Sequence, residues 1–176
     1  MKRFILTGAP GAGKTTLIRA LAGLGRAVVE EAATDVIADM QAEGLAEPWT
    51  HETFLVRIVE LQRSRRLAPC GGGVQLHDRS AICTYALALH LGRPVPPALK
   101  AELEAIASEG VFERRVLFVR NIGFVEPTAA RRISFEDSLA FEALHEQVYR
   151  ELGYELVEIA AAPVETRVRQ VLVAAT

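Results

Sequence analysis

The sequence predicts a three-layer α/β/α fold, in which helices cover both faces of a five-stranded parallel sheet. Five β-rich runs alternate with segments of helical periodicity, which is typical of such sheets; the runs lie at 3–7, 26–30, 74–77, 114–120 and 154–159. A glycine-rich turn at 8–13 joins the first run directly to a helical pattern. The 176 residues fit one domain, so we predict a single domain over 1–176.

The predicted helices follow from apolar spacing and from their start and stop residues. Leu17, Ile18 and Leu21 line one face of the helix after the glycine-rich turn. Ser134 opens a capping box, and Gly153 ends the helix that follows it. The predicted helices span 14–24, 34–43, 50–66, 81–91, 134–152 and 163–173.

The composition is that of an ordinary globular protein, with a formal net charge of only -2. It indicates no general attraction to nucleic acid. The longest apolar stretch, 81–91, is about half of the roughly 20 residues that a membrane span needs. The apolar run before Gly8 is too short for an export signal. Cys70 and Cys83 are isolated, which favours reduced thiols. We therefore predict a cytoplasmic protein without a nucleic-acid or membrane partner.

The turn at 8–15 matches the phosphate-binding pattern G-x-x-x-x-G-K followed by Ser or Thr, between an apolar strand and an amphipathic helix. Glycines let the backbone turn its N–H groups inward around phosphate oxygens, and the helix N-terminus adds partial positive charge. The alternative to a phosphate-binding loop is a glycine-rich turn with a surface lysine and no ligand. The predicted nucleotide-binding residues are Gly8, Ala9, Pro10, Gly11, Ala12, Gly13, Lys14, Thr15 and Thr16.

Three side chains of this turn are expected to contact the nucleotide directly. We expect Lys14 to reach the β and γ phosphates, the Thr15 hydroxyl to bind Mg²⁺, and Thr16 to contact the α phosphate. The predicted cofactors are ATP and Mg²⁺, with GTP left open. The guanine and switch motifs of regulatory GTPases and the signature of transporter ATPases do not occur in the sequence, which favours the compact kinase-like class.

Asp78 and Arg79 follow the third predicted strand, at the end where parallel sheets bind ligands. We predict that Asp78 holds Mg²⁺, directly or through water, and that the Arg79 guanidinium meets acceptor or phosphate oxygens. The structural alternative is that Asp78 or Ser80 only caps the next helix, with Arg79 solvated.

Glu31 lies at the end of the second predicted strand, beside the same crevice. An acceptor hydroxyl needs a carboxylate in reach to take its proton, and Glu31 is the preferred base. Asp78 is left open as an alternative base. Glu30 is expected to point to the opposite face, and both glutamates are also consistent with simple helix-start acids.

The segment 120–133 lies where a kinase lid would fall, and Arg131 and Arg132 are expected to clamp phosphates on closure. A solvated arginine pair is the alternative. The basic run Arg63, Arg65 and Arg66 is interpreted as a solvated helix end. The four histidines show no metal-ligand spacing and are expected to be packing or surface residues.

Taken together, these residues resemble small P-loop kinase-like domains, often described as AAA-type ATPases and similar to the nicotinamide riboside kinase module. The resemblance covers nearly the whole chain and rests on 8–16, 29–33, 78–80 and 149–157. It implies the strand order 2-3-1-4-5, a small lid and ATP-dependent phosphorylation. Relatives often carry an arginine where this chain has Thr34. The resemblance therefore does not fix which acceptor this chain recognises.

Two functions follow as hypotheses. The first is an Mg-dependent kinase that transfers the γ-phosphate of ATP to a hydroxyl of a nucleoside-like or other small acceptor. The second is a nucleotide-binding regulatory ATPase or GTPase that senses ATP or GTP and acts through a protein partner. A monomer and a homodimer are both consistent with the sequence.

Overall fold

The fold is built on a five-stranded, fully parallel sheet in the order β2-β3-β1-β4-β5. The structure, a computed structural model, describes residues 1–69, 71–121 and 134–176. The observed strand order is the one that the family resemblance implies. The strands are β1 (Lys2–Thr7), β2 (Ala27–Val29), β3 (Val74–Asp78), β4 (Arg115–Val119) and β5 (Glu155–Ile159).

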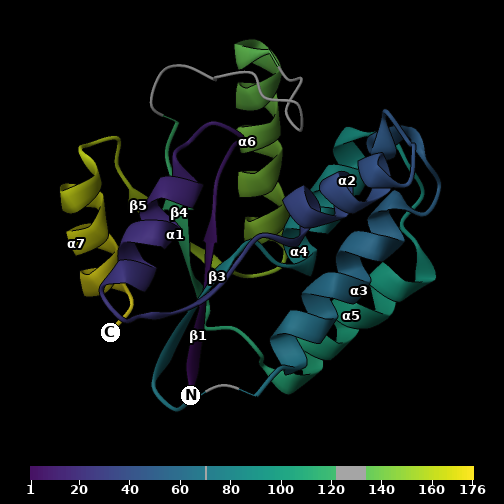
Figure 1. The fold of residues 1–176 in the computed structure, drawn as a ribbon. Coiled ribbons are helices and arrows are strands. Elements are labelled where there is room, and N and C mark those ends of the chain that lie inside the picture. The colour runs from purple at the N-terminus through teal and green to yellow at the C-terminus, as the bar shows by residue number, and fades with distance from the viewer. Residues whose placement is uncertain (70, 122–133) are drawn as a thin grey trace.

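Helices cover both faces of the sheet (Figure 1), as the alternating sequence pattern predicts. On one face, α1 (Lys14–Gly23) and α7 (Val164–Ala174) pack on Phe4, Leu6 and Leu117. On the other face, a larger core includes Ile5 and Val116. The helices that pack there are α2 (Ala32–Ala42), α3 (Phe54–Leu67), α4 (Ala81–His90), α5 (Pro97–Glu109) and α6 (Phe135–Glu151).

Neighbouring residues of one strand therefore enter different cores, as strand geometry requires. In β1, Phe4 and Leu6 face α1 and α7, whereas Ile5 faces the larger helical layer. All three side chains are fully buried. β1 is thus a central strand with apolar side chains on both faces, and the loop that follows it leaves the sheet between the two helical layers.

Helix α5 (Pro97–Glu109) is an element that the sequence analysis does not predict. Its boundaries nevertheless have ordinary signals: Pro97 lies in its first turn, and Gly110 ends it in the left-handed conformation with φ 59°. Leu99 and Ile106 are buried on its inner face. The helix predicted at 50–66 begins later than expected, at Phe54, and a 3₁₀ turn at Pro48–Thr50 precedes it.

The interpretation of the basic run on α3 as a solvated helix end is wrong for two of its three arginines. Arg66 is 5% exposed, and its Nε and Nη2 donate to the two carboxylate oxygens of Glu102 on α5 at 2.7 and 3.2 Å. Such a two-pronged, buried pair fixes the relative position of the two helices. The Arg65 side chain is 25% exposed and pairs with Asp35 on α2. Arg63 alone is largely exposed, with 64% side-chain exposure.

Among the described residues, no helix combines the length and the apolar character that crossing a membrane requires.

Candidate active site

The loop between β1 and α1 has the backbone conformation that its glycines permit. Gly8, Gly11 and Gly13 have φ values of 138°, 85° and 77°, in the region that side chains disfavour. A Cβ at Gly8 would lie 2.2 Å from the Val119 carbonyl oxygen of β4. Gly13 caps α1 without a side-chain hydrogen bond, so no side chain fills the start of this helix. The loop is thus shaped as a backbone cradle at a helix N-terminus.

Lys14 lies folded over this cradle. Its side chain is 7% exposed, and Nζ donates hydrogen bonds to the carbonyl oxygens of Gly8 at 3.0 Å and Ala9 at 2.7 Å. Burial and the nearby Arg79 lower the pKa of Lys14 to about 7, although Asp78 and Glu31 act in the opposite direction. An arriving polyphosphate would stabilise the ammonium form, because it adds negative charge at this buried position.

Asp78 ends β3 beside the cradle, as predicted. It is 6% exposed, and its Oδ1 has no hydrogen-bond partner among the described residues. Burial and the neighbouring Glu31 raise the pKa of Asp78 to about 6, despite the positive charges of Lys14 and Arg79. A buried carboxylate oxygen without a partner suits a hard cation. Together with the exposed Thr15 hydroxyl at the start of α1, it fits the donor set expected for Mg²⁺.

The structural alternative for the segment after β3 is confirmed for Ser80 but not for Asp78. Ser80, not Asp78, caps α4, and its Oγ accepts a hydrogen bond from the backbone N–H of Ile82. The Asp78 carboxylate is therefore not used to cap this helix. Ser80 also contacts the hydroxyl of Tyr149 at 3.2 Å, which ties this turn to α6.

The Arg79 side chain is only 11% exposed, so it is not a solvated arginine. It is the one non-glycine residue among those described with positive φ, at 71°, and its backbone N–H donates to the Leu6 carbonyl oxygen. This conformation is strained for arginine and is characteristic of functional sites. The side chain forms an ion pair with Glu31, with 2.6 Å between Nε and Oε1. Arg79 thus connects the ends of β2 and β3.

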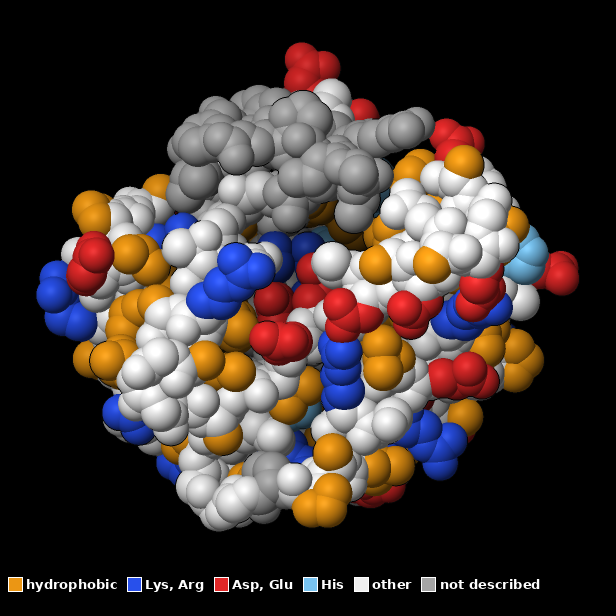
Figure 2. Space-filling model, in the orientation of Figure 1, with side chains coloured by type: hydrophobic (Ala, Val, Ile, Leu, Met, Phe, Trp, Pro, Cys, Tyr) orange, Lys and Arg blue, Asp and Glu red, His pale blue; other side chains and the backbone are white. Residues whose placement is uncertain are grey.

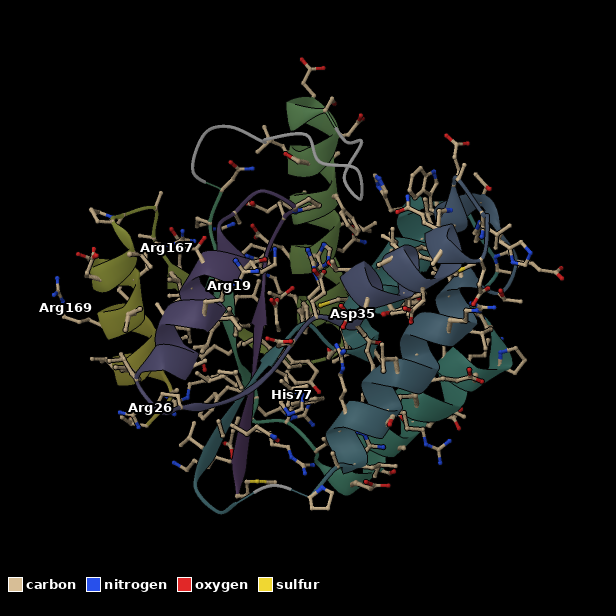
Figure 3. The ribbon with its side chains drawn as sticks, in the orientation of Figure 1. Arg19, Arg26, Asp35, His77, Arg167 and Arg169 are labelled. Atoms are coloured by element: carbon tan, nitrogen blue, oxygen red, sulfur yellow. The ribbon has the colours of Figure 1, made fainter. Side chains whose placement is uncertain are left out.

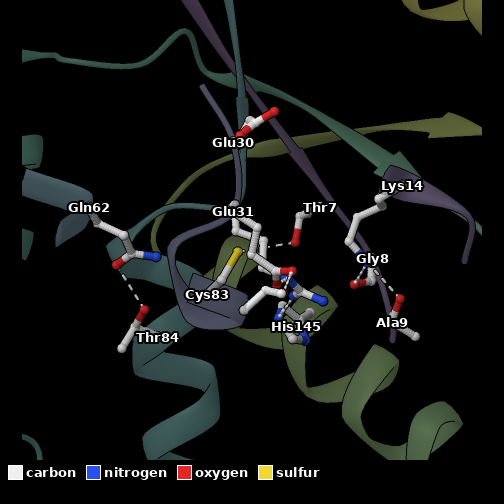
Figure 4. Close-up of polar contacts among 12 residues, drawn as sticks. Thr7, Gly8, Ala9, Lys14, Glu30, Glu31, Gln62, Cys83, Thr84 and His145 are labelled. Carbon is white, nitrogen blue, oxygen red and sulfur yellow. Dashed lines mark hydrogen bonds and ion pairs between the residues drawn. The ribbon is translucent and has the colours of Figure 1, made fainter. Parts of the chain in front are cut away.

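Glu31 precedes α2 and keeps its carboxylate charged. Burial favours its neutral form, but Arg79 and Lys14 outweigh this effect, and the pKa of Glu31 is lowered. Its Oε2 also accepts a hydrogen bond from Thr34 Oγ1 at 2.9 Å. Figure 4 shows Glu30 directed away from Glu31, as strand alternation predicts. Thr34 therefore helps to orient the candidate base.

His145 on α6 also contacts Arg79, although the sequence analysis assigns it no role. It is fully buried, and its Nδ1 donates to the Phe141 carbonyl oxygen four residues earlier, at 2.8 Å. Nε2 therefore accepts from Arg79 Nη1 at 3.3 Å. Burial, assisted by Arg79, lowers the pKa of His145 to about 3, so the ring stays neutral. No local motif marks this residue, because the contact joins two distant segments.

Arg65 is a second residue that sequence reasoning missed. From α3 it donates through Nη1 to the carbonyl oxygens of Glu30 and Glu31, at 3.0 and 2.9 Å, and it pairs with Asp35 on α2. The backbone that carries Glu31 is therefore held from outside the strand. A basic helix end gives no sequence signal for such a contact.

A set of buried polar side chains links β1, the strand before the cradle, to α6. Thr7 Oγ1 lies 3.2 Å from the Cys83 sulfur (Figure 4). The same sulfur lies 3.1 Å from the Tyr149 hydroxyl. Cys83 is a free, buried thiol, as expected for a reduced cysteine. Cys70 lies outside the described residues. This group packs behind the site and positions β1 against α4 and α6.

The structure therefore brings residues 8–16, Glu31, Asp78 and Arg79 together at the carboxyl end of the sheet. Acidic and basic side chains gather side by side in the middle of the face that Figure 2 shows. Arg131 and Arg132, and most of the predicted lid at 120–133, lie outside the described residues. Arg120, at the end of β4, is bound by Glu142 and Glu146 of α6 and by Glu158 of β5.

A family model described as an AAA domain matches residues 3–167. The chain belongs to this AAA domain family. The match includes the phosphate-binding loop and every element of the site described above. The comparison with curated protein sequences gives no match.

Solved structures share the fold at low sequence identity. A NadR protein in complex with NAD and AMP-PNP is similar with a TM-score of 0.67 and 20% identity, over 98% of this chain and 48% of that chain. This chain thus spans about half the length of NadR. A deoxyadenosine kinase from M. mycoides with bound dCTP gives 0.64 and 13% identity, over 98% and 97% of the two chains. A shikimate kinase from Acinetobacter baumannii in complex with shikimate gives 0.54 and 16%, over 98% and 91%.

Proposed function

We propose that this AAA domain family member is an ATP-dependent kinase that transfers the γ-phosphate to a hydroxyl group of a small, nucleoside-like or other alcohol acceptor. The proposal depends on one observation: phosphate-binding groups and an ionised carboxylate lie at the same edge of the sheet. Lys14 and the backbone cradle suit a polyphosphate, whereas the Glu31 and Arg79 pair faces the same space from β2 and β3.

The shared fold supports this proposal. NadR, deoxyadenosine kinase and shikimate kinase are described with AMP-PNP, dCTP and shikimate bound, and two of the three are kinases by name. A small recess lies beside Asp78 and Arg79, with Gln62 and Arg65 in its wall.

On the nucleotide side, the loop amides and the α1 N-terminus would bind the phosphate oxygens of ATP. Lys14 would leave the Gly8 and Ala9 carbonyls and donate to the β and γ phosphates. Thr15 and Asp78 would hold Mg²⁺, which neutralises charge on the polyphosphate when bound. The uncommitted Oδ1 of Asp78 is available for this role.

On the acceptor side, Glu31 would accept the proton of the attacking hydroxyl as its oxygen bonds to the γ-phosphorus and the bond to ADP breaks. Arg79 keeps this carboxylate ionised and aims it, because their ion pair is 2.6 Å long. The Arg79 guanidinium retains N–H groups for the acceptor or the transferred phosphoryl group. Arg131 and Arg132 would add charge from the predicted lid.

The test is incubation with Mg-ATP and a panel of small hydroxylated metabolites, nucleosides and sugar acids included, with mass spectrometry of the products. The proposal predicts one acceptor class that gains the mass of a phosphate while ATP becomes ADP. Tight ATP binding without any phosphorylated product would contradict the kinase and favour the nucleotide-binding regulator.

A further inference from the structure

Arg167 on α7 is a buried arginine that the proposed reaction does not use. It is 5% exposed, and no carboxylate among the described residues pairs with it. Burial lowers the pKa of Arg167 below the ordinary arginine value. Figure 3 shows Arg167 and the exposed Arg169 on the same helix, beside α1. An arginine that is buried without a counter-ion is costly, so buried charges are normally paired.

The contacts of Arg167 are with the backbone of the phosphate-binding loop. Its Nη2 donates a buried hydrogen bond to the Ala12 carbonyl oxygen at 2.5 Å, across 155 residues of sequence. Nη1 lies 2.8 Å from the position that a Cβ on Gly13 would take. The guanidinium therefore lies directly against the Ala12–Gly13 peptide. Its Nε is buried and has no partner among the described residues.

The Ala12 carbonyl and the Gly13 N–H are the two ends of a single peptide group. The described chain contains no cis peptide bond, so these two ends point in opposite directions. Arg167 lies on the carbonyl side, and the Gly13 N–H consequently points away from it. This N–H has no acceptor among the described residues and belongs to the residue that caps α1.

A charged donor on a carbonyl oxygen polarises the peptide and strengthens the hydrogen bond that its N–H donates. We propose that Arg167 is a positioning residue for the nucleotide, which polarises the Ala12–Gly13 peptide from behind the loop and makes the Gly13 N–H a stronger donor to phosphate. The inference rests on the proposed nucleotide site and extends that site to α7.

Placement behind the loop separates Arg167 from Lys14. Lys14 lies over the inner side of the loop, where it donates to the Gly8 and Ala9 carbonyls. Arg167 instead donates to the Ala12 carbonyl, so the two cations contact different peptide groups of the loop. A polyphosphate would also supply the negative charge that this buried guanidinium lacks within the described part of the chain.

The experiment measures Mg-ATP affinity by calorimetry for the full chain and for Arg167→Met, Arg167→Lys and Arg167→Gln. Arg169→Met is the matched control, because Arg169 is exposed two residues away and its side chain donates a hydrogen bond to Thr166 on its own helix. We expect Arg167→Met to weaken ATP binding on the order of tenfold, since a charge-assisted hydrogen bond is lost. Arg169→Met should bind ATP as the wild type does.

The lysine and glutamine variants separate charge from simple support of the loop. Lysine retains a charged donor, so Arg167→Lys should bind ATP within about threefold of wild type. Glutamine retains a neutral donor, and Arg167→Gln should stay close to Arg167→Met. Thermal unfolding without ligand checks that each variant folds. If Arg167→Met does not fold, the comparison of lysine with glutamine decides by itself.

Three results would overturn the inference. ATP affinity equal to wild type in Arg167→Met would show that the contact is irrelevant to binding. Full recovery in Arg167→Gln would show that an uncharged support is sufficient. Absence of ATP binding in the wild type would overturn the proposed function, and this inference with it, whereas the first two results leave the proposed function intact.

Discussion

The two sides of the candidate active site are built in different ways. The nucleotide side is contiguous in sequence: the backbone of 8–16 makes the cradle, and Lys14 contacts carbonyls only five and six residues away. The acceptor side is assembled from separate segments, with Glu31 after β2, Arg79 after β3 and His145 on α6. One side depends on backbone conformation and the other on long-range contacts between side chains.

This difference bears on how such a site can change its substrate. A cradle fixed by positive φ values at Gly8, Gly11 and Gly13 tolerates few substitutions, because other residues disfavour these angles. The acceptor side can change through single side chains, such as Thr34 beside Glu31, without disturbing the phosphate site. The phosphate donor is thus more strongly constrained than the acceptor.

The largest effect is expected from Lys14→Ala. It removes the ammonium from the nucleotide side, and we expect ATP turnover to fall at least about a hundredfold, with markedly weaker triphosphate binding. Calorimetry and a coupled ADP assay measure the two quantities. Arg19→Ala, exposed on the same helix, is the control. An unchanged triphosphate affinity in Lys14→Ala would mean that the nucleotide does not bind at this loop.

Glu31→Gln tests whether the two sides act separately. The neutral amide cannot take the acceptor proton, so phosphorylation should fall about a hundredfold or more, while ATP affinity stays within a few fold of wild type. Glu30→Gln is the matched control, since Glu30 is exposed and directed away from the site. If both variants retain activity, neither glutamate is the base, and Asp78 becomes the candidate.

The same difference explains what could be predicted from the sequence. The parallel sheet and the phosphate loop were predictable because their signals are local: β-rich runs that alternate with helical spacing, and glycines at fixed intervals before Lys14. The strand order came from the family resemblance. Asp78 and Arg79 were also predictable, because any residue after β3 must lie at the ligand edge of the sheet.

Residues that act across the fold could not be predicted in this way. Arg65 and His145 reach the site from α3 and α6, and Arg167 reaches the loop from α7. Nothing in their neighbours in sequence distinguishes them from ordinary helix residues, because the contacts exist only once the sheet has brought the helices together. Helix α5 is a different case: Pro97 and Gly110 marked both of its ends.

Asp78→Asn tests whether the charge of Asp78, the predicted Mg²⁺ ligand, lowers the stability of the folded protein. The pKa of Asp78 is raised from 3.8 to about 6 in the folded protein, so its charged form destabilises the fold. This penalty is absent below the unfolded pKa, grows as the pH rises from the unfolded to the folded pKa, and is complete above the folded one. The difference in pKa corresponds to at most about 3 kcal/mol.

Asp78→Asn should therefore be more stable than wild type at pH 7 in the absence of nucleotide, and this advantage should vanish near pH 4. Denaturant unfolding of both proteins between pH 4 and pH 8 measures it. A stability difference that is constant with pH would show that the Asp78 charge is not the cause. Nucleotide binding should nevertheless weaken in the variant, because the predicted Mg²⁺ ligand is lost.

The smallest effect is expected from His145, which supports the acceptor side from a distance. His145→Leu removes the acceptor of the Arg79 Nη1 hydrogen bond, and we expect kcat to fall about tenfold with little change in ATP affinity. His145→Gln places an amide oxygen near the position of Nε2 and should recover most of this loss. Because the ring is neutral, with a pKa of about 3, the activity of the wild type should show no titration of His145 between pH 5 and pH 8. If leucine and glutamine behave alike, Arg79 is aimed by Glu31 alone, and the acceptor side depends on one long-range contact instead of two.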